Sequence, residues 1–119
     1  MEKRPQFSVD YETPSADIGV VVLVGEIDIY SAPEFKEVLV NGIEGGAHKM
    51  IVDLSQVTFI DSTALGVLVS GAKRVRPRNG NLDIVCTDAS IIRIFEITGL
   101  DRIFGIYPSR GEAIKAAAS

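Results

Sequence analysis

Three continuous apolar runs constrain the fold of this chain more than any other feature of its sequence. Residues 20–24, 50–54 and 82–86 consist mostly of valine, isoleucine and leucine. Short runs of this kind are typical of strands covered on both faces, whereas a half-exposed strand alternates apolar and polar residues. The sequence therefore predicts a buried sheet, with residues 20–24 in a central strand.

Amphipathic segments separate these runs and predict helices. Each begins with a residue that can cap a helix, and serine followed three residues later by glutamate forms a capping box at Ser31 and at Ser109. Glycine or proline ends the first three segments. The predicted helices run from Ser31 to the glycines at 45 and 46, from Ser62 to Val75, from Asp88 to Gly99, and from Ser109 onward.

The two ends of the sheet are predicted by weaker patterns. Phe7, Val9 and Tyr11 alternate with polar residues, and the turn-rich segment 13–17 after them favours a hairpin. Residues 103–107 form a last short apolar segment that closes the sheet. We predict an α/β fold with a mixed, mostly parallel sheet of about five strands flanked by about four helices, in one domain spanning residues 1–119.

Composition excludes several classes of function. Sixteen acidic and twelve basic residues give a net charge of -4, which argues against a nucleic-acid partner. The basic cluster at 73–78 falls at a predicted helix end, where cations are stabilising. No stretch approaches the roughly 18 apolar residues of a membrane span. We expect a cytoplasmic protein with no membrane partner, no cofactor and no metal.

Cys86 is the only cysteine, so an internal disulfide is impossible. It lies in a predicted buried strand, where a free cysteine usually packs as a small apolar side chain. A redox sensor would need an exposed thiolate. We therefore interpret Cys86 as a core residue.

Candidate functional residues lie in two loops beyond the carboxyl ends of the predicted parallel strands, where α/β folds gather their sites. One loop carries Glu26 and Asp28, and the other runs from residue 55 to residue 63. The apolar residues of the second loop are expected to be partly buried and to anchor it; they are Val57, Phe59 and Ile60.

Ser62 opens the predicted second helix and has two interpretations. It could be a plain N-cap whose side-chain oxygen accepts a backbone hydrogen bond. It could also be a phosphoacceptor, because phosphorylation adds about -1.5 to -2 charges beside the positive end of the helix dipole. Thr63 could be a second acceptor, although its place one residue into the helix predicts lower accessibility.

Segment 53–68, DLSQVTFIDSTALGVL, resembles the signature of STAS-domain anti-sigma factor antagonists. Segments 25–35 and 95–104 resemble the family's second-strand to first-helix region and its third-helix to last-strand region. Ala64 departs from the pattern, because many relatives have glycine there. The resemblance covers nearly the whole chain and implies the STAS fold.

By this resemblance, the unphosphorylated protein would bind an anti-sigma factor that is also a serine kinase, and would thereby free a sigma factor. Phosphorylation of Ser62 would break the complex, and a serine phosphatase would restore it. The protein would be a monomer or weak dimer and not an enzyme. The expected partner-binding residues are Asp28, Ser31, Phe59, Asp61, Ser62, Thr63, Leu65 and Gly66. Asp28 is equally well explained as an acidic cap of the following turn.

Four alternatives compete with this hypothesis. A serine hydrolase needs a histidine base beside Ser62, but His48, the only histidine, precedes the strand that Ser62 follows. A phospho-aspartate receiver is imitated by Glu26, Asp28 and Asp53, yet Asp53 falls within a strand run and not at its tip. Within the STAS resemblance, a subunit of a stress-signalling scaffold stays open, and an anion-transporter tail is disfavoured.

Overall fold

A five-stranded sheet organises the computed structural model, which describes residues 7–119. In chain order the elements are β1 (Ser8–Ser15), β2 (Ile18–Ile27), α1 (Ala32–Glu44), β3 (Lys49–Ile60), α2 (Ser62–Val75), the 3-10 turn η1 (Arg76–Arg78), β4 (Asn81–Val85), α3 (Ala89–Thr98), the 3-10 turn η2 (Leu100–Arg102), β5 (Gly105–Tyr107) and α4 (Arg110–Ala118). The strands are ordered β1-β2-β3-β4-β5. Only β1 pairs antiparallel, so the prediction of a mixed, mostly parallel sheet with four helices is confirmed.

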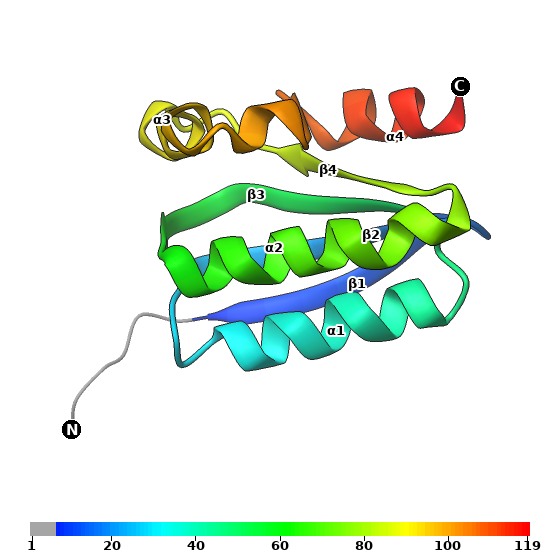
Figure 1. The fold of residues 1–119 in the computed structure, drawn as a ribbon, viewed down its shortest axis with the longest axis horizontal. Coiled ribbons are helices and arrows are strands. Elements are labelled where there is room, and N and C mark those ends of the chain that lie inside the picture. The colour runs from blue at the N-terminus through cyan, green and yellow to red at the C-terminus, as the bar shows by residue number, and fades with distance from the viewer. Residues whose placement is uncertain (1–6) are drawn as a thin grey trace.

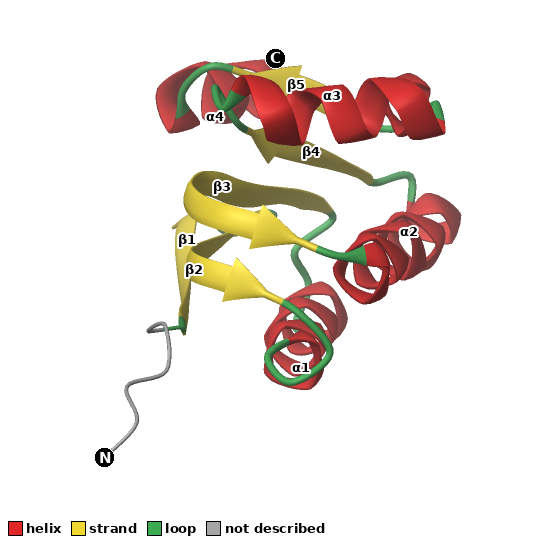
Figure 2. Ribbon diagram, turned by 90° about the vertical axis from the view of Figure 1, so that its left-hand side faces the viewer, coloured by secondary structure: helices red, strands yellow, loops and turns green. Residues whose placement is uncertain are grey.

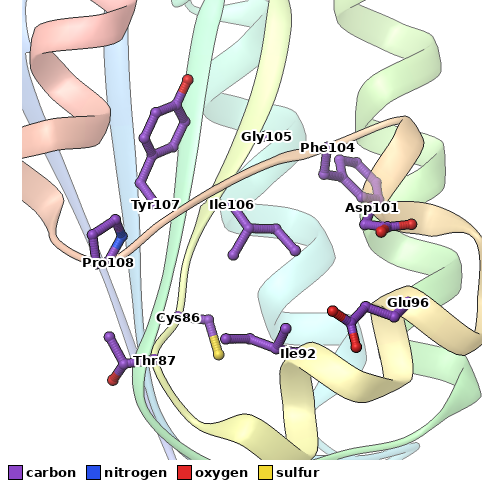
Figure 3. A pocket seen from close by; sticks show the side chains of 10 residues that line it. All are labelled: Cys86, Thr87, Ile92, Glu96, Asp101, Phe104, Gly105, Ile106, Tyr107 and Pro108. Atoms are coloured by element: carbon purple, nitrogen blue, oxygen red, sulfur yellow. The ribbon is translucent and has the colours of Figure 1, made fainter.

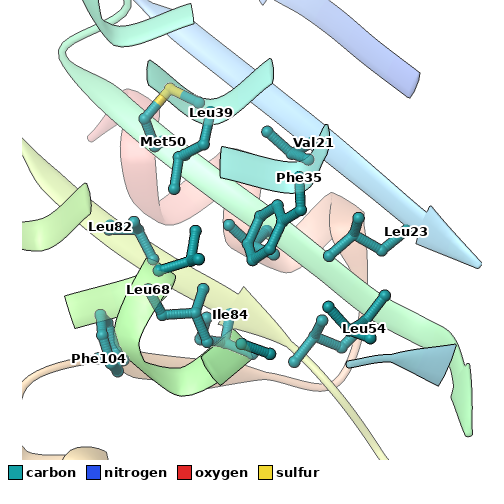
Figure 4. Packing of buried hydrophobic residues seen from close by; sticks show 14 of the residues in the cluster. Val21, Leu23, Phe35, Leu39, Met50, Leu54, Leu68, Leu82, Ile84 and Phe104 are labelled. Carbon is teal, nitrogen blue, oxygen red and sulfur yellow. The ribbon is translucent and has the colours of Figure 1, made fainter. Parts of the chain in front are cut away.

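Two layers of helix cover the sheet. α1 and α2 lie side by side on one face, as Figures 1 and 2 show. Figure 4 shows the core beneath them, in which Phe35 and Leu39 of α1 meet Leu68 of α2 and side chains of β2, β3 and β4. On the other face, α4 packs with Ala113 and Ala117 against a smaller cluster that includes Val20 and Ile51. The apolar runs are therefore buried from both sides, as predicted.

The structure corrects the predicted loop at residues 55–63. β3 continues to Ile60, because residues 56–60 pair in parallel with β2 after β4 has ended. Irregularities in the pairing near Gly25, whose φ is +97°, allow the two strands to stay together. Val57 and Ile60 face the core as predicted, but Phe59 is exposed. β2 and β3 thus form a two-stranded extension that carries Phe59 at its end.

Smaller corrections concern the ends of the sheet. The hairpin between β1 and β2 is confirmed, but its turn comprises only Ala16 and Asp17, because β1 extends to Ser15. The last strand, β5, begins at Gly105, and the preceding apolar residues belong to the approach from η2. α4 begins as predicted at the Ser109 cap, whose hydroxyl accepts a hydrogen bond from the backbone N–H of Glu112.

The basic cluster at 73–78 lies at the end of α2, as predicted, and two of its arginines also contact the end of the neighbouring helix α1. Arg78 donates to the carbonyl of Ile43 at 2.7 Å, and Arg74 lies 3.6 Å from the carboxylate of Glu44. Both contacts are at the last turn of α1, which contains no basic residue of its own. Cations at this end complement the helix dipole. Among the described residues, no helix is long and apolar enough to cross a bilayer.

Asp83 is buried in β4, and we expect it to make the stability of the protein depend on pH. It accepts hydrogen bonds from the N–H of Gly105 and the side-chain amide of Asn81. Burial raises the pKa of Asp83, and these two hydrogen bonds oppose the rise. A raised folded-state pKa means that the stability contributed by the protonated acid is lost as pH increases through that pKa. We expect Asp83→Asn to raise the Tm more at pH 7 than at pH 4. Thermal melts at both pH values would measure this, and an equal change at both would contradict it.

Candidate functional site

The beginning of α2 exposes two adjacent hydroxyls. Asp61, in extended conformation, is the N-cap, and its carboxylate accepts a hydrogen bond from the N–H of Ala64 at 3.1 Å. Ser62 is the first helical residue, so its interpretation as the N-cap is wrong. Its side chain is exposed and makes no hydrogen bond to any described residue. The Ser62 hydroxyl is therefore free to react.

Thr63 is also exposed. Both hydroxyls lie at the N-terminal end of a 14-residue helix, where unpaired backbone N–H groups favour an anion. His48 precedes β3, whereas Ser62 follows it, so the only histidine lies at the opposite end of a 12-residue strand. No histidine base can activate Ser62, and a hydrolytic triad is excluded.

The loop between β2 and α1 lies beside Ser62 at the same end of the sheet, which Figure 2 views along the strands. Asp28 accepts hydrogen bonds from the N–H groups of Tyr30 and Ser31 at 2.9 and 3.1 Å. Hydrogen bonds from the backbone of Ser31 and then Tyr30 lower the pKa of Asp28. The interpretation of Asp28 as an acidic cap of the following turn is thus supported.

Ser31 holds this loop closed and does not form the predicted capping box. Its hydroxyl donates to the carbonyl of Glu26 and accepts from the N–H of Asp28, both at 2.9 Å. Its side chain makes no cap bond to α1, and the residue is 8% exposed. Ser31 therefore shapes the surface from beneath and contributes little area to it.

Three large apolar side chains are exposed around Ser62. Ile29, Tyr30 and Phe59 are 57%, 73% and 48% exposed. Phe59 was predicted to be partly buried, and about half of its surface is covered. Ile29 and Tyr30 were not predicted as site residues. Their only sequence signal was an aliphatic and an aromatic residue in an otherwise polar turn. Grouped apolar exposure of this kind is typical of a protein interaction site.

A groove of about 410 Å³ lies between the first turns of α1 and α2. We call it the α1–α2 groove; it is lined by Ile29, Ala32, Pro33, Lys36, Thr63, Gly66, Val67 and Ser70. Gly66 has open space where a Cβ atom would lie, so it leaves the groove unfilled. Leu65 is half-buried, packs against the core and does not line the groove. The groove joins Thr63 to the exposed apolar loop through Ile29.

The remaining candidates serve the core. Asp53 is 3% exposed and is bound by Arg110. In the parallel pairing of β2 and β3 it lies opposite Val22, four residues before Glu26. The three acids therefore do not form a receiver pocket.

Burial raises the pKa of the Cys86 thiol, consistent with a core residue. Among residues 7–119, no group of three or more histidine, cysteine or acidic side chains could hold a metal.

Comparison with known proteins agrees with this architecture. The family model of the STAS domain matches residues 10–113. The anti-sigma-B factor antagonist of Bacillus subtilis is 42% identical over 99 residues, which cover 83% of this chain and 89% of the relative. An anti-sigma factor antagonist from Mycobacterium paratuberculosis superposes with a TM-score of 0.86 at 25% identity, covering 96% of each chain.

The fold also matches that of the anti-sigma factor antagonist SpoIIAA in its unphosphorylated form, at 17% identity and a TM-score of 0.83 over 93% of this chain and 96% of the other. SpoIIAA has also been solved in a phosphorylated form, with a TM-score of 0.74. At this identity the likeness concerns the fold alone. The family match over residues 10–113, together with relatives named anti-sigma-B factor antagonists, shows that this chain belongs to the STAS domain family.

Proposed function

We propose that the unphosphorylated protein binds an anti-sigma factor with serine kinase activity and that phosphorylation of Ser62 by this kinase ends the complex. Binding would release a sigma factor in the cytoplasm, and a serine phosphatase would return the protein to its binding form. The anti-sigma-B factor antagonists among its relatives support a partner of this class.

The observation that carries this proposal is the free Ser62 hydroxyl beside an apolar patch. Because Asp61 caps α2, modification of Ser62 removes no hydrogen bond that the described structure needs. The helix dipole favours the added anion, so the fold can accept it without unfolding. SpoIIAA, which shares the fold, exists in a phosphorylated form. The switch would therefore act on the surface and not on the stability of the protein.

The same phosphate would oppose docking. It places about -1.5 to -2 charges at the centre of a contact surface that is apolar at Ile29 and Phe59. A partner covering these side chains would have to remove water from the dianion, at a cost of several kcal/mol unless it offers a new cation. The carboxylates of Asp28 and Asp61 flank the site. A partner that tolerates these two negative charges would meet a larger negative charge once Ser62 carries a phosphate.

We expect phosphate to be found at Ser62 by mass spectrometry of the protein recovered from its native cell. A Ser62→Ala variant should lack the modification and should still capture the kinase partner, whereas Ser62→Glu should lose capture. Ala89→Glu is the matched control, because it places the same charge at the first residue of α3. This control should bind like the unmodified protein. Absence of phosphate under every growth condition, with no kinase captured, would contradict the proposal.

We further propose that the free protein is a monomer or weak dimer. Size-exclusion chromatography with light scattering distinguishes this from a subunit of a large stress-signalling scaffold. A particle many times the 12.8 kDa mass of the chain would favour the scaffold.

A further inference from the structure

A second hollow lies between α3 and β5, away from the α1–α2 groove (Figure 3). Its volume is about 570 Å³, within the range of about 300–1,000 Å³ that is usual for small-ligand sites. Apolar side chains form most of its wall, among them Ile92 of α3 and Ile106 and Tyr107 of β5. Because β5 is the last strand of the sheet, no further strand covers this side.

Two carboxylates at this hollow are unpaired. Glu96 and Asp101 both line it, both are exposed, and neither side-chain carboxylate makes a hydrogen bond or ion pair with any described residue. Figure 3 shows the Glu96 carboxylate directed from α3 toward Ile92 and Cys86, into the hollow. No lysine or arginine is among the lining residues. The hollow therefore combines an apolar wall with uncompensated negative charge.

We propose that this hollow binds an ammonium or guanidinium group carried on an apolar stem. The stem would pack against Ile92 and Ile106, and the cation would lie between the carboxylates of Glu96 and Asp101. Nothing in this arrangement involves Ser62, so the site is independent of the proposed switch.

Two sources could supply this chemistry. One is a free alkyl amine, and the other is a lysine or arginine side chain of a protein segment lying along β5. The carbonyl of Tyr107 faces β4, where it accepts from the N–H of Cys86. Backbone groups alternate in direction along a strand, so those of Ile106 face away from β4 and could bond to an added segment. The second source would thus gain affinity that a free amine lacks.

The test is a titration of the isotope-labelled protein followed by NMR, using pentylamine, pentanol and the peptide acetyl-Val-Lys-Val-amide as probes. Pentylamine should shift the amide signals of α3 and β5, and pentanol, which has the same stem without the charge, should bind at least tenfold more weakly. Glu96→Gln/Asp101→Asn should weaken pentylamine binding at least tenfold. Glu34→Gln/Glu37→Gln is the matched control, because it removes the same charge from exposed positions on α1.

The peptide identifies the source. Binding of the peptide at least tenfold tighter than pentylamine would support the site and assign it to a protein segment. Equal affinities would support the site and assign it to a free amine. If neither probe shifts α3 and β5 at 20 mM, or if both double variants weaken binding equally, the proposal is wrong. Thermal melts should show that all variants remain folded, since neither Glu96 nor Asp101 has a partner to lose.

Discussion

Replacement of Arg110 by methionine is expected to lower the free energy of unfolding by about 3 kcal/mol, because it leaves a buried carboxylate without its cation. Arg110 begins α4 and binds Asp53 of β3 through two nitrogens, each at 3.0 Å. The Asp53 side chain is 4% exposed, whereas Arg110 is 34% exposed. Methionine keeps much of the packing of the arginine stem, so charge removal dominates the effect. Urea denaturation at pH 7 measures it.

The second variant in this test is Asp53→Asn/Arg110→Met. Its asparagine keeps an acceptor for the N–H of Ser55, which now bonds to Asp53 at 2.9 Å, and it needs no cation. The double variant should therefore recover more than half of the lost stability. Arg74→Met is the matched control, because the Arg74–Glu44 pair is 3.6 Å long and about half exposed on each side. Such a pair contributes at most about 1 kcal/mol.

The outcome also bears on how α4 is held. This helix buries fully only two alanines, so apolar contacts contribute little to its docking. Its first residue is bound to Asp53 and, at 2.9 Å, to Glu12 of β1, and the carbonyl of Ala117 near its end accepts from Lys49 of β3. If Arg110→Met cost less than 1 kcal/mol, these polar contacts would not be what holds α4 to the sheet.

The Asp53–Arg110 ion pair is a contact that could not be predicted from the sequence. The run 50–54 predicted a buried strand although it contains Asp53, and that prediction is confirmed. The partner of the aspartate lies 57 positions away in the chain. Spacing within one element carries no information about such a contact. The predicted fold was therefore correct while its main buried ion pair was not foreseen.

Local patterns failed where two capping residues compete. Asp61 and Ser62 both favour N-cap positions, and the extended conformation of Asp61 decides in its favour. Near Ser31, the preceding Asp28 accepts the N–H of Ser31 and closes a turn, so the serine hydroxyl points back to β2 and not to the helix. The sequence alone did not show which residue would cap each helix. The choice matters at α2, because capping by Asp61 leaves the Ser62 hydroxyl without a hydrogen-bond partner.

The end of β3 was missed for a different reason. Ser55, Gln56 and Thr58 are polar because this part of the strand has solvent on one side, and that composition is typical of a loop. Pairing with β2 keeps it extended, and pairing is a property of two segments together. The exposure of Phe59 follows from this geometry. The apolar patch of the candidate site could therefore be recognised only in the folded structure.

Substitution of Gly66 by leucine is expected to separate stability from binding. Gly66 lies inside α2, and leucine is more favourable than glycine in a helix by about 0.8 kcal/mol. Its Cβ would meet no atom within 4 Å, so the fold should accept the side chain and become more stable. The same side chain would fill the α1–α2 groove beside Thr63. If the kinase partner docks there, loss of a central contact should weaken binding by about 2 kcal/mol, or roughly 30-fold.

Gly111→Leu is the control for this substitution. Gly111 is also an exposed helical glycine, in the first turn of α4, and its Cβ would come no closer than 4.0 Å to the Ser109 hydroxyl. It lies on a helix that packs on the opposite face of the sheet from α1 and α2. Calorimetry with the captured anti-sigma factor should therefore show unchanged affinity for Gly111→Leu and a large loss for Gly66→Leu. Equal affinities for both variants would mean that the partner contacts Ser62 from the side of Phe59 and leaves the groove empty.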